Sequence, residues 1–598
     1  MTIKLSDWVA QKLVDEGIQH VFMVTGGGAM HLNHSLGSHS ELECVFNHHE
    51  QACAMAAESY FRVNNKLAVV NVTSGPGGTN AITGIYGAYA DSIGCVVLSG
   101  QVKLETTVQS TGMPLRQYGD QELDIEKMIR PITKYSVMLT DPTTIRYHLE
   151  KALYLAKTGR PGPCWLDIPL DIQAARIDPD ALAGFDPAEL NEPWKGRDLT
   201  ADCDIILDRL AKAERPVIYA GNGINLSGQQ AAFLKLVDKL GIPVVTGFNA
   251  HDTIWNEHPC HAGRPGTIGD RAGNFVAQNS DCLLILGTRL NIRQISYNWK
   301  SFARQAFKIW VDVDGLELAR PNIQADMPVV ADLKDLIPAL AARPYPGATD
   351  GHKSWLAWAV ERKTRFPVVL EEYWTNKVVN PYCFMDSLFD NLPEGRIVVA
   401  ANATACITSF QASKLKPGQR LWSNSGAASM GYDLPAAIGA CKASGDQPII
   451  CLAGDGSIMM NLQELQTIVS NQMPIKIFLL NNSGYVSIFQ TQRNFFKGDE
   501  IGAGPKSGVQ FPNFEPLMKA FGLPYVRCNR HDDLASSIQA TLAANGPAVC
   551  EVILDENQPF APKLSSKQMP DGTIVSPELE DMAPFLSREE LAENMLIK

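Results

Sequence analysis

Short apolar runs alternate along the whole chain with segments of helical periodicity. One such run, residues 67–72, ends at a glycine-rich turn at 74–78. An apolar strand, a glycine-rich turn, a helix and a further strand form the repeating unit of parallel sheets, so the pattern predicts an α/β fold. Further runs of this kind occur at 95–98, 216–221, 243–246, 283–287, 397–400, 449–453, 475–480 and 548–553.

Two stretches without this pattern divide the chain. Residues 174–198 contain acidic residues and prolines, and residues 342–352 are rich in proline and glycine, as is typical of linkers. The length of 598 residues corresponds to about three to six domains of roughly 100–200 residues each. We therefore predict three doubly wound parallel-sheet domains at 1–175, 195–340 and 355–560, followed by a C-terminal tail at 561–598.

Composition and charge narrow the class of protein. Hydrophobic residues make up 45% of the chain and charged residues 19%, which argues against disorder, collagen and coiled coil. The formal net charge of −12 gives no basic footprint for nucleic acid. No apolar run reaches the ~18 residues of a spanning helix, the first residues lack a signal-peptide pattern, and the thirteen scattered cysteines indicate buried thiols in a reducing compartment. We expect a cytoplasmic enzyme that binds neither membranes nor nucleic acid.

The segment with the clearest chemistry is Gly454-Asp455-Gly456-Ser457, which follows the apolar run at 449–453. A helix is predicted over 461–471, and the next apolar run leads to Asn482. A right-handed crossover brings the carboxyl ends of the two strands together, and with them a carboxylate and an amide oxygen. Such oxygens suit Mg²⁺ or Ca²⁺, and Mg²⁺ usually adds phosphate oxygens, which glycine N–H groups can approach closely. The alternative is a surface turn in which Asp455 caps a helix.

This motif resembles the signature of the thiamin diphosphate-dependent enzymes, in which Gly-Asp-Gly is followed after a similar gap by Asn-Asn, here 481–482. The resemblance implies that Asp455, Asn482 and the backbone carbonyl of Gly484 hold Mg²⁺ on the diphosphate. It also implies that the first domain binds the pyrimidine ring, the central domain is Rossmann-like and the third domain binds the diphosphate. The predicted cofactor contacts in the third domain are Asn402, Thr404, Gly426, Met430, Gly454, Gly456, Ser457, Ser483, Gly484 and Tyr485.

Thiamin chemistry also needs a carboxylic acid, because the aminopyrimidine removes the C2 proton of the thiazolium only when its ring N1′ is hydrogen-bonded to such a group. An apolar pocket suits this acid, since desolvation raises its pKa. The segment 46–60 closely resembles the family's His-Glu-Gln segment that opens a small-residue helix, and Glu50 is the candidate. The alternative is an ordinary carboxylate in a first helical turn, where the macrodipole favours it.

Three further segments, 21–28, 73–80 and 425–432, resemble family loops around the reacting atoms. In the last of them Met430 is expected to wedge between the two cofactor rings, and a plain core methionine is the alternative. Gln121 matches a family glutamine that reaches the active centre. His31 and His49 are candidate acid–base groups, and a structural role is equally open for each. The remaining predicted site residues of the first domain are Thr25, Gly26, Gly27, Thr73, Pro76 and Asn80.

Within the family, the chain resembles the acetohydroxyacid (acetolactate) synthases, which carry FAD on the central domain without net redox chemistry. Gly221-Asn222-Gly223 follows a predicted strand, as a dinucleotide site requires, although the spacing is not Gly-x-Gly-x-x-Gly. The usual Met-His of the family is replaced in the segment 263–266. A vestigial nucleotide fold is the alternative to FAD binding. The stretches that carry this resemblance are 73–77, 88–93, 130–134, 159–163 and 434–440, and the positions it assigns to FAD are Arg160, Gly223, Gly266, Arg289, Asp312 and Asp332.

The segments expected to bind the acceptor depart from these synthases. Leu170 stands where they have Lys, Thr491 where they have a substrate-selecting Trp, and 486–487 where they have Gly-Met. Losing the Lys and the Trp removes an anchor for a second 2-keto acid and enlarges the pocket. In this respect the chain is more similar to the carboligase of branched-sugar (yersiniose) biosynthesis, which adds the two-carbon unit of pyruvate to the ketone of a nucleotide-bound deoxysugar.

We therefore predict a carboligase that decarboxylates pyruvate and transfers its two-carbon acyl-anion unit to a ketone or aldehyde. The alternatives are an acetolactate synthase joining two 2-keto acids, a non-ligating decarboxylase or C–C hydrolase, a pyridine-nucleotide dehydrogenase and an inactive scaffold. The family forms its thiamin site between two subunits, which implies a homodimer or homotetramer. The tail segment 568–572 is expected to close over the site.

Overall fold

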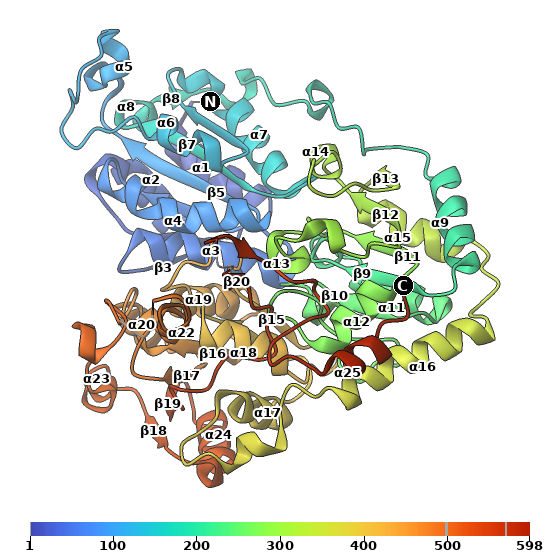
Figure 1. Cartoon of the computed structure of the whole chain (residues 1–598). Helices are drawn as coiled ribbons and strands as arrows, with labels where there is room; N and C mark the ends of the chain where they lie inside the picture. Colours follow the sequence, from blue (N-terminus) through green and yellow to red (C-terminus); the bar gives the residue numbers. More distant parts are fainter. Residues whose placement is uncertain (1, 497–499, 569–570, 598) are drawn as a thin grey trace.

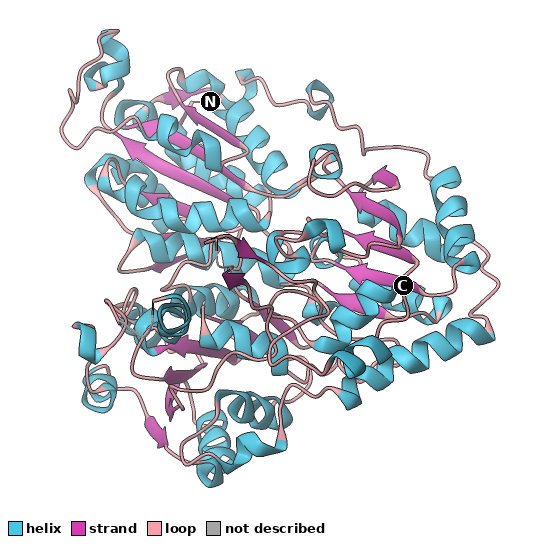
Figure 2. Ribbon diagram, viewed as in Figure 1, coloured by secondary structure: helices cyan, strands magenta, loops and turns pink. Residues whose placement is uncertain are grey.

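The computed structural model describes residues 2–496, 500–568 and 571–597. It contains three parallel sheets flanked by helices (Figure 1, Figure 2). The predicted α/β class with three doubly wound sheets is confirmed. Because helices cover both faces of such sheets, the central strands are buried on both faces instead of alternating between buried and exposed positions. All seven residues of β5 (Cys95–Gln101) are buried.

The first sheet has the strand order β3-β2-β4-β5-β7-β6, and all neighbouring pairs are parallel. A short antiparallel pairing of β1 (Ile3–Lys4) with β8 (Arg176–Ile177) closes this first unit. Its other strands are β2 (His20–Met23), β3 (Glu43–Phe46), β4 (Val69–Val72), β6 (Tyr135–Met138) and β7 (Pro163–Pro169). Its main helices are α1 (Leu5–Asp15), α2 (Met30–Gly37), α3 (Glu50–Asn64), α4 (Pro76–Asp91), α7 (Ile145–Lys157) and α8 (Leu170–Ala174).

The second unit is reached through residues 178–199, which cross from the first sheet without an α-helix or a strand (Figure 1). Its sheet has the order β10-β9-β11-β12-β13, again all parallel. The strands are β9 (Pro216–Ala220), β10 (Val244–Thr246), β11 (Cys282–Leu286), β12 (Phe307–Asp312) and β13 (Met327–Val330). The main helices are α9 (Thr200–Lys212), α11 (Gln230–Leu240), α12 (Arg271–Asn279), α15 (Leu333–Ala342) and α16 (Asp350–Arg365).

The third unit contains a sheet of order β15-β14-β16-β17-β19-β18, also parallel. Its strands are β14 (Ile397–Ala400), β15 (Arg420–Trp422), β16 (Ile449–Gly454), β17 (Ile475–Asn481), β18 (Tyr525–Cys528) and β19 (Ala548–Ile553). Its main helices are α17 (Pro381–Asn391), α18 (Thr404–Ala412), α19 (Asp433–Ala443), α21 (Glu464–Ser470), α22 (Val486–Phe495) and α24 (Leu534–Ala543).

The first and third units share one apolar core, although they are far apart in sequence. The contact is made by α3 and α19, which are both rich in small residues. Gly439 lies against the backbone carbonyl of Ala56, so closely that any side chain at 439 would overlap it. Small residues therefore let the two helix backbones approach, and this approach fixes the first unit on the third.

The C-terminal tail runs back over the second unit. Asn279 donates from Nδ2 to the Asn594 carbonyl (2.8 Å), and Gln278 from Nε2 to the Glu580 carboxylate (2.7 Å). The predicted closing segment 568–572 includes 569–570, which lie outside the described residues. Within the described part of the chain, no helix combines the length and apolar character needed to cross a bilayer.

Candidate functional site

A cavity of about 320 Å³ opens at the carboxyl ends of three neighbouring strands of the third sheet. Asn402 follows β14, Asp455 follows β16 and Asn482 follows β17, and all three line the cavity. The sequence placed Asp455 and Asn482 at one edge of a parallel sheet, and the structure brings them together there. The other predicted contacts that line this cavity are Thr404, Met430, Gly454, Gly456, Ser457, Gly484 and Tyr485.

Asp455 is held by backbone N–H groups rather than by a cationic side chain. Its carboxylate accepts from the N–H groups of Gly456 (2.7 Å), Asn482 (3.0 Å) and Gly484 (3.2 Å). Burial raises its pKa to about 7, while these backbone donors favour the ionised form. Asn482 donates from Nδ2 to Thr404 Oγ1 (3.0 Å), so its Oδ1 is the atom left for a cation. A carboxylate, an amide oxygen and a nearby backbone carbonyl are hard ligands that suit Mg²⁺.

The Met430 loop crosses the cavity between Asn402 and the start of α19. Asn402 donates from Nδ2 to the Ser429 carbonyl (2.5 Å), and Gly431 donates its N–H to Ser457 Oγ (2.9 Å). Ser457 in turn donates to Asp433 (2.5 Å), whose pKa burial raises to about 6. The loop that carries Met430 is thus tied to both sides of the cavity.

Glu50 is the first residue of α3 and is 9% exposed. Its Oε2 accepts from Asn80 Nδ2 at 2.9 Å, so these two predicted residues are in contact. His49 caps the helix, because its Nδ1 accepts from the Gln51 N–H (3.0 Å). That capping bond gives His49 a structural role. Its acid–base role stays a prediction.

Thr73 connects the two glycine-rich loops of the first unit. Its side chain packs against Gly26 and Gly77, and its Oγ1 accepts from the Gly28 N–H (3.1 Å). The carbonyl of Gln121 lies against Gly75, the residue before Pro76 at the start of α4. The structure therefore gathers most of the first unit's predicted residues around one point. Thr25 and Gly27 lie in the first of these loops, whereas His31 lies in α2, where burial lowers its pKa.

The loop of Gln121 is supported by a buried carboxylate that sequence analysis did not single out. Asp167 accepts from Ser99 Oγ (2.6 Å) and Gln101 Nε2 (2.9 Å), and Gln101 also donates to the Leu123 carbonyl (2.8 Å). Burial raises the pKa of Asp167 to about 7. A carboxylate two residues from the end of β7 thereby fixes the backbone beside Gln121.

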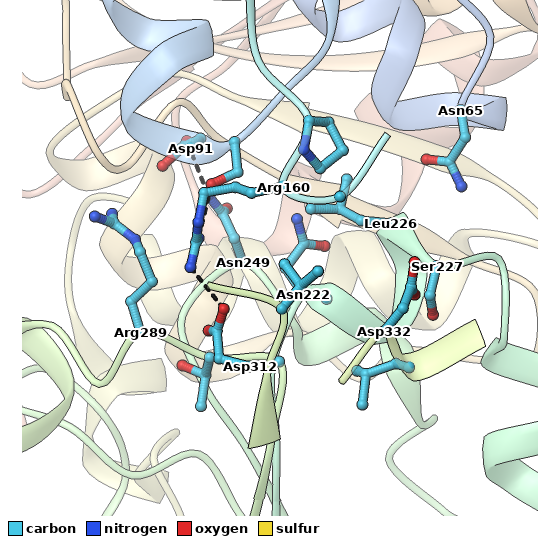
Figure 3. A pocket seen from close by; sticks show the side chains of 18 of the residues that line it. Asn65, Asp91, Arg160, Asn222, Leu226, Ser227, Asn249, Arg289, Asp312 and Asp332 are labelled. Atoms are coloured by element: carbon cyan, nitrogen blue, oxygen red, sulfur yellow. Dashed lines mark hydrogen bonds and ion pairs between the residues drawn. The ribbon is translucent and has the colours of Figure 1, made fainter. Parts of the chain in front are cut away.

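A second cavity, of about 360 Å³, lies where the three units meet (Figure 3). Arg160 points into it from the first unit and forms an ion pair with Asp312 (2.7 Å) at the end of β12. Burial raises the pKa of Asp312, and Arg160 opposes that shift. Of the residues predicted to contact FAD, Gly223, Arg289 and Asp332 also line this cavity, whereas Gly266 is not among the described residues that do.

Sequence reasoning missed several lining residues, because they belong to no motif that it singled out as a site. Phe248 lines both cavities, and Arg293 lines the first. Asp91 and Asn249 line the second, although Asp91 stood within the family-like stretch 88–93. Of these residues, only Asp91 could have been identified from the sequence, because it lies in that stretch.

Arg264, in the segment where the family's Met-His is replaced, points away from both cavities. It is 2% exposed and donates to the carbonyls of Phe410 (2.8 Å) and Ser413 (2.7 Å) at the C-terminal end of α18. A cation suits the negative end of a helix dipole. This departure from the family therefore supports the helix whose other end, at Thr404, faces the first cavity.

The predicted residues do not all reach one cavity within a single chain. The described residues that line the first cavity come from the second and third units, and Glu50 of the first unit is not one of them. The carboxylates of Glu50 and Asp455 therefore do not line a common cavity within one chain.

Comparison with known proteins assigns the chain to a family. Three models of thiamine pyrophosphate (thiamin diphosphate) enzymes match it: the N-terminal TPP binding domain at residues 3–128, the central domain at 203–340 and the C-terminal TPP binding domain at 403–552. Similar proteins include the "Probable acetolactate synthase large subunit" of Methanocaldococcus jannaschii, 28% identical over 94% of both chains. Others are the "Acetolactate synthase large subunit" of Lactococcus lactis, 29% identical over 94% of both chains, and "Acetolactate synthase, chloroplastic" of Arabidopsis thaliana, 29% identical over 94% of this chain and 83% of the other. The chain therefore belongs to the acetolactate synthase-like thiamine pyrophosphate enzymes, which carry out carboligation.

Proposed function

We propose that this enzyme decarboxylates pyruvate and transfers the two-carbon unit to a ketone or aldehyde acceptor, with a nucleotide-linked keto-deoxysugar as the preferred class. This choice of acceptor class rests on the small side chain of Thr491. Residues 486–488 of α22 line the first cavity, and Thr491, one turn further, is exposed. A small residue at this point leaves the mouth of the cavity open to a bulky acceptor.

We assign the diphosphate and its cation to the first cavity. Asp455, Asn482 and the Gly484 carbonyl would hold Mg²⁺, and the N-terminal end of α18 at Thr404 faces the phosphate position. Unpaired N–H groups and the helix dipole favour an anion there. The three units then correspond to a pyrimidine-binding domain (1–175), a central domain (195–340) and a diphosphate-binding domain (355–560), with the C-terminal tail (561–598) near the active site.

When bound, thiamin diphosphate supplies a carbon nucleophile and an electron sink for the decarboxylation. The chain's task is to hold and move protons around it. Glu50, buried beside Asn80, would hold a proton at Oε1 or Oε2 toward the ring nitrogen of the aminopyrimidine. Met430 would pack against the rings of the cofactor, and the apolar wall of the cavity would exclude water from the reacting atoms.

Glu50 would reach the cavity of a second copy of the chain. Within one chain it does not line the cavity, while its own α3 is anchored on the third unit through α19. A site completed by two chains requires at least a homodimer, and a dimer or tetramer is part of the proposed function. A cytoplasmic location fits the thirteen cysteines, which are all free thiols.

Replacing Thr491 with Trp tests the acceptor class. The larger side chain should lower kcat/KM for a nucleotide-linked keto-deoxysugar by roughly tenfold or more, because it fills the mouth of the cavity. Release of CO₂ from pyruvate should change little. Carbon-labelled pyruvate, offered with either the keto-deoxysugar or more pyruvate, identifies the products by NMR.

Thr491→Ser is the matched control and should behave as wild type. Acetolactate as the sole product, whatever acceptor is offered, would favour the acetolactate synthase alternative. Free acetaldehyde alone would favour the non-ligating decarboxylase.

We assign FAD, in a non-redox role, to the second cavity. Gly223, Arg289 and Asp332 follow β9, β11 and β13, and Asp312 ends β12, so all four lie at the carboxyl edge of the second sheet. That edge is where open α/β sheets bind nucleotides. Arg160 adds a cation from the first unit.

Arg160→Gln should weaken FAD binding by roughly tenfold or more, because a charge-assisted hydrogen bond contributes about 1.5–3 kcal/mol. The purified wild-type protein should be yellow and release flavin on denaturation, and the variant should release much less. Arg176→Gln, at an exposed position of β8, is the control. A colourless wild-type protein that fails to take up added FAD would refute this assignment and leave the vestigial nucleotide fold.

A further inference from the structure

The segment from Asp455 to Glu464 runs from the first cavity to the beginning of α3. The predicted helix over 461–471 starts later in the structure, at Glu464. Asn461 and Glu464 are both fully buried. A buried polar side chain costs free energy unless it has partners, so the partners of these two residues show what holds them there.

Glu464 holds the loop directly before α3. Its carboxylate accepts from Asn47 Nδ2 (2.9 Å) and from the His48 backbone N–H (3.0 Å). A third donor, Thr467 Oγ1 (2.8 Å), comes from the next turn of α21. A carboxylate of the third unit thus fixes the two residues of the first unit that precede His49 and Glu50.

Asn461 connects the same helix start to the Met430 loop. Its Nδ2 donates to Gln51 Oε1 (2.9 Å) and to the Gly431 carbonyl (2.7 Å). Gly431 has a φ of 80°, and a side chain there would come within 2.8 Å of Asn461 Nδ2. Both amide hydrogens are therefore used, one beside Glu50 and the other beside Met430.

We propose that Asn461 and Glu464 form a clamp that positions Glu50 relative to the cofactor. The clamp rests on the proposed function in one respect, the completion of each site by two chains. In that arrangement Met430 serves the cavity of its own chain, and Glu50 serves the cavity of the partner. The clamp then lies between the two cofactor sites of a dimer, and Glu464 acts only on the site that its own Glu50 completes.

Hybrid assemblies isolate this effect. One chain carries Glu50→Gln, the other carries Asp455→Ala, and the two are co-expressed with different tags and purified through both. In a hybrid dimer, one site keeps both Glu50 and Asp455, so about half of the wild-type activity should return. Glu464→Gln is then added to one chain or the other. The substitution keeps the shape of the side chain but presents an NH₂ group to one of its two donors from the first unit.

On the Asp455→Ala chain, which supplies the working Glu50, Glu464→Gln should lower kcat by roughly 10- to 100-fold, because a displacement near 1 Å at the reacting groups has an effect of this order. On the Glu50→Gln chain it should leave kcat within about twofold of the hybrid that lacks it, since its α3 there carries no working carboxylate. Equal effects in the two placements, or none in either, would overturn the clamp. If the starting hybrid recovers no activity, the shared site of the proposed function fails.

Hydrogen exchange of the backbone amides in the cofactor-free protein tests the clamp even if the starting hybrid is inactive. Glu464→Gln should speed exchange in the peptide containing His48, whose N–H loses its acceptor, while the Kd for thiamin diphosphate stays close to wild type. Gln466→Ala is the matched control, because Gln466 is exposed and donates to Ser470 (2.8 Å) on the same helix. Unchanged exchange at His48 in the Glu464→Gln chain would overturn the clamp.

Discussion

Replacing Glu50 with Gln is expected to lower kcat for pyruvate decarboxylation by roughly 100- to 10,000-fold, the range that a positioned acid–base group contributes. Gln has nearly the same shape and can still hydrogen-bond to Asn80, so the fold and the start of α3 should remain. It cannot give a proton to the aminopyrimidine in the way a carboxylic acid does. The loss should therefore appear in kcat, while the Kd for thiamin diphosphate changes much less.

The measurement is CO₂ release from labelled pyruvate with saturating cofactor, together with deuterium exchange at C2 of the bound cofactor. Glu41→Gln, an exposed carboxylate of the same unit, is the matched control and should retain full activity. Wild-type turnover by the Glu50→Gln chain would refute the assignment of this residue and reopen the reading of Glu50 as an ordinary residue of the first helical turn.

Replacing Asp455 with Ala should abolish the stabilisation that thiamin diphosphate and Mg²⁺ give to the folded protein. Binding at 100 times Kd stabilises the folded state by about 2.7 kcal/mol, which raises the melting temperature. Without the carboxylate the cation loses its charged ligand, so the shift should disappear at cofactor concentrations that saturate wild type. Differential scanning calorimetry with and without the cofactor and Mg²⁺ measures it.

The Ala variant must also be compared with wild type in the absence of cofactor, because Asp455 accepts three backbone N–H groups that its removal leaves unpaired. Asp446→Asn is the control, since Asp446 lies in the same unit and its side chain is 56% exposed. A full thermal shift in the Asp455→Ala chain would mean that the cation and the diphosphate bind elsewhere.

The strands around the first cavity could be predicted because their signals are local. The apolar run at 449–453 became β16 and the run at 475–480 became β17, each within one residue. A crossover between parallel strands has one preferred hand, so the meeting of Asp455 and Asn482 followed from sequence order and chain geometry. The start of α21 differed by three residues, because the buried side chain of Asn461 binds Gln51 and Gly431 before the helix begins.

Residues that support a site through long-range hydrogen bonds could not be predicted in this way. Arg264 lies in a segment that departs from the family, but the sequence does not show that its side chain binds the carbonyls at the end of α18. Asp167 looked like part of a buried strand, and only its bonds to Ser99 and Gln101 show that it supports the backbone beside Gln121. Long-range hydrogen bonds leave no periodic mark on the sequence.

By itself, the sequence of this protein determined three parallel sheets and the strand ends that carry Asp455 and Asn482, since hydrophobic periodicity and turn residues act over a few positions. Only the tertiary structure decided that Glu464 of the third unit holds the loop directly before Glu50 of the first unit. The reason is that packing α3 on α19 is set by small residues more than 300 positions apart, whose contact appears only when the complete chain has folded.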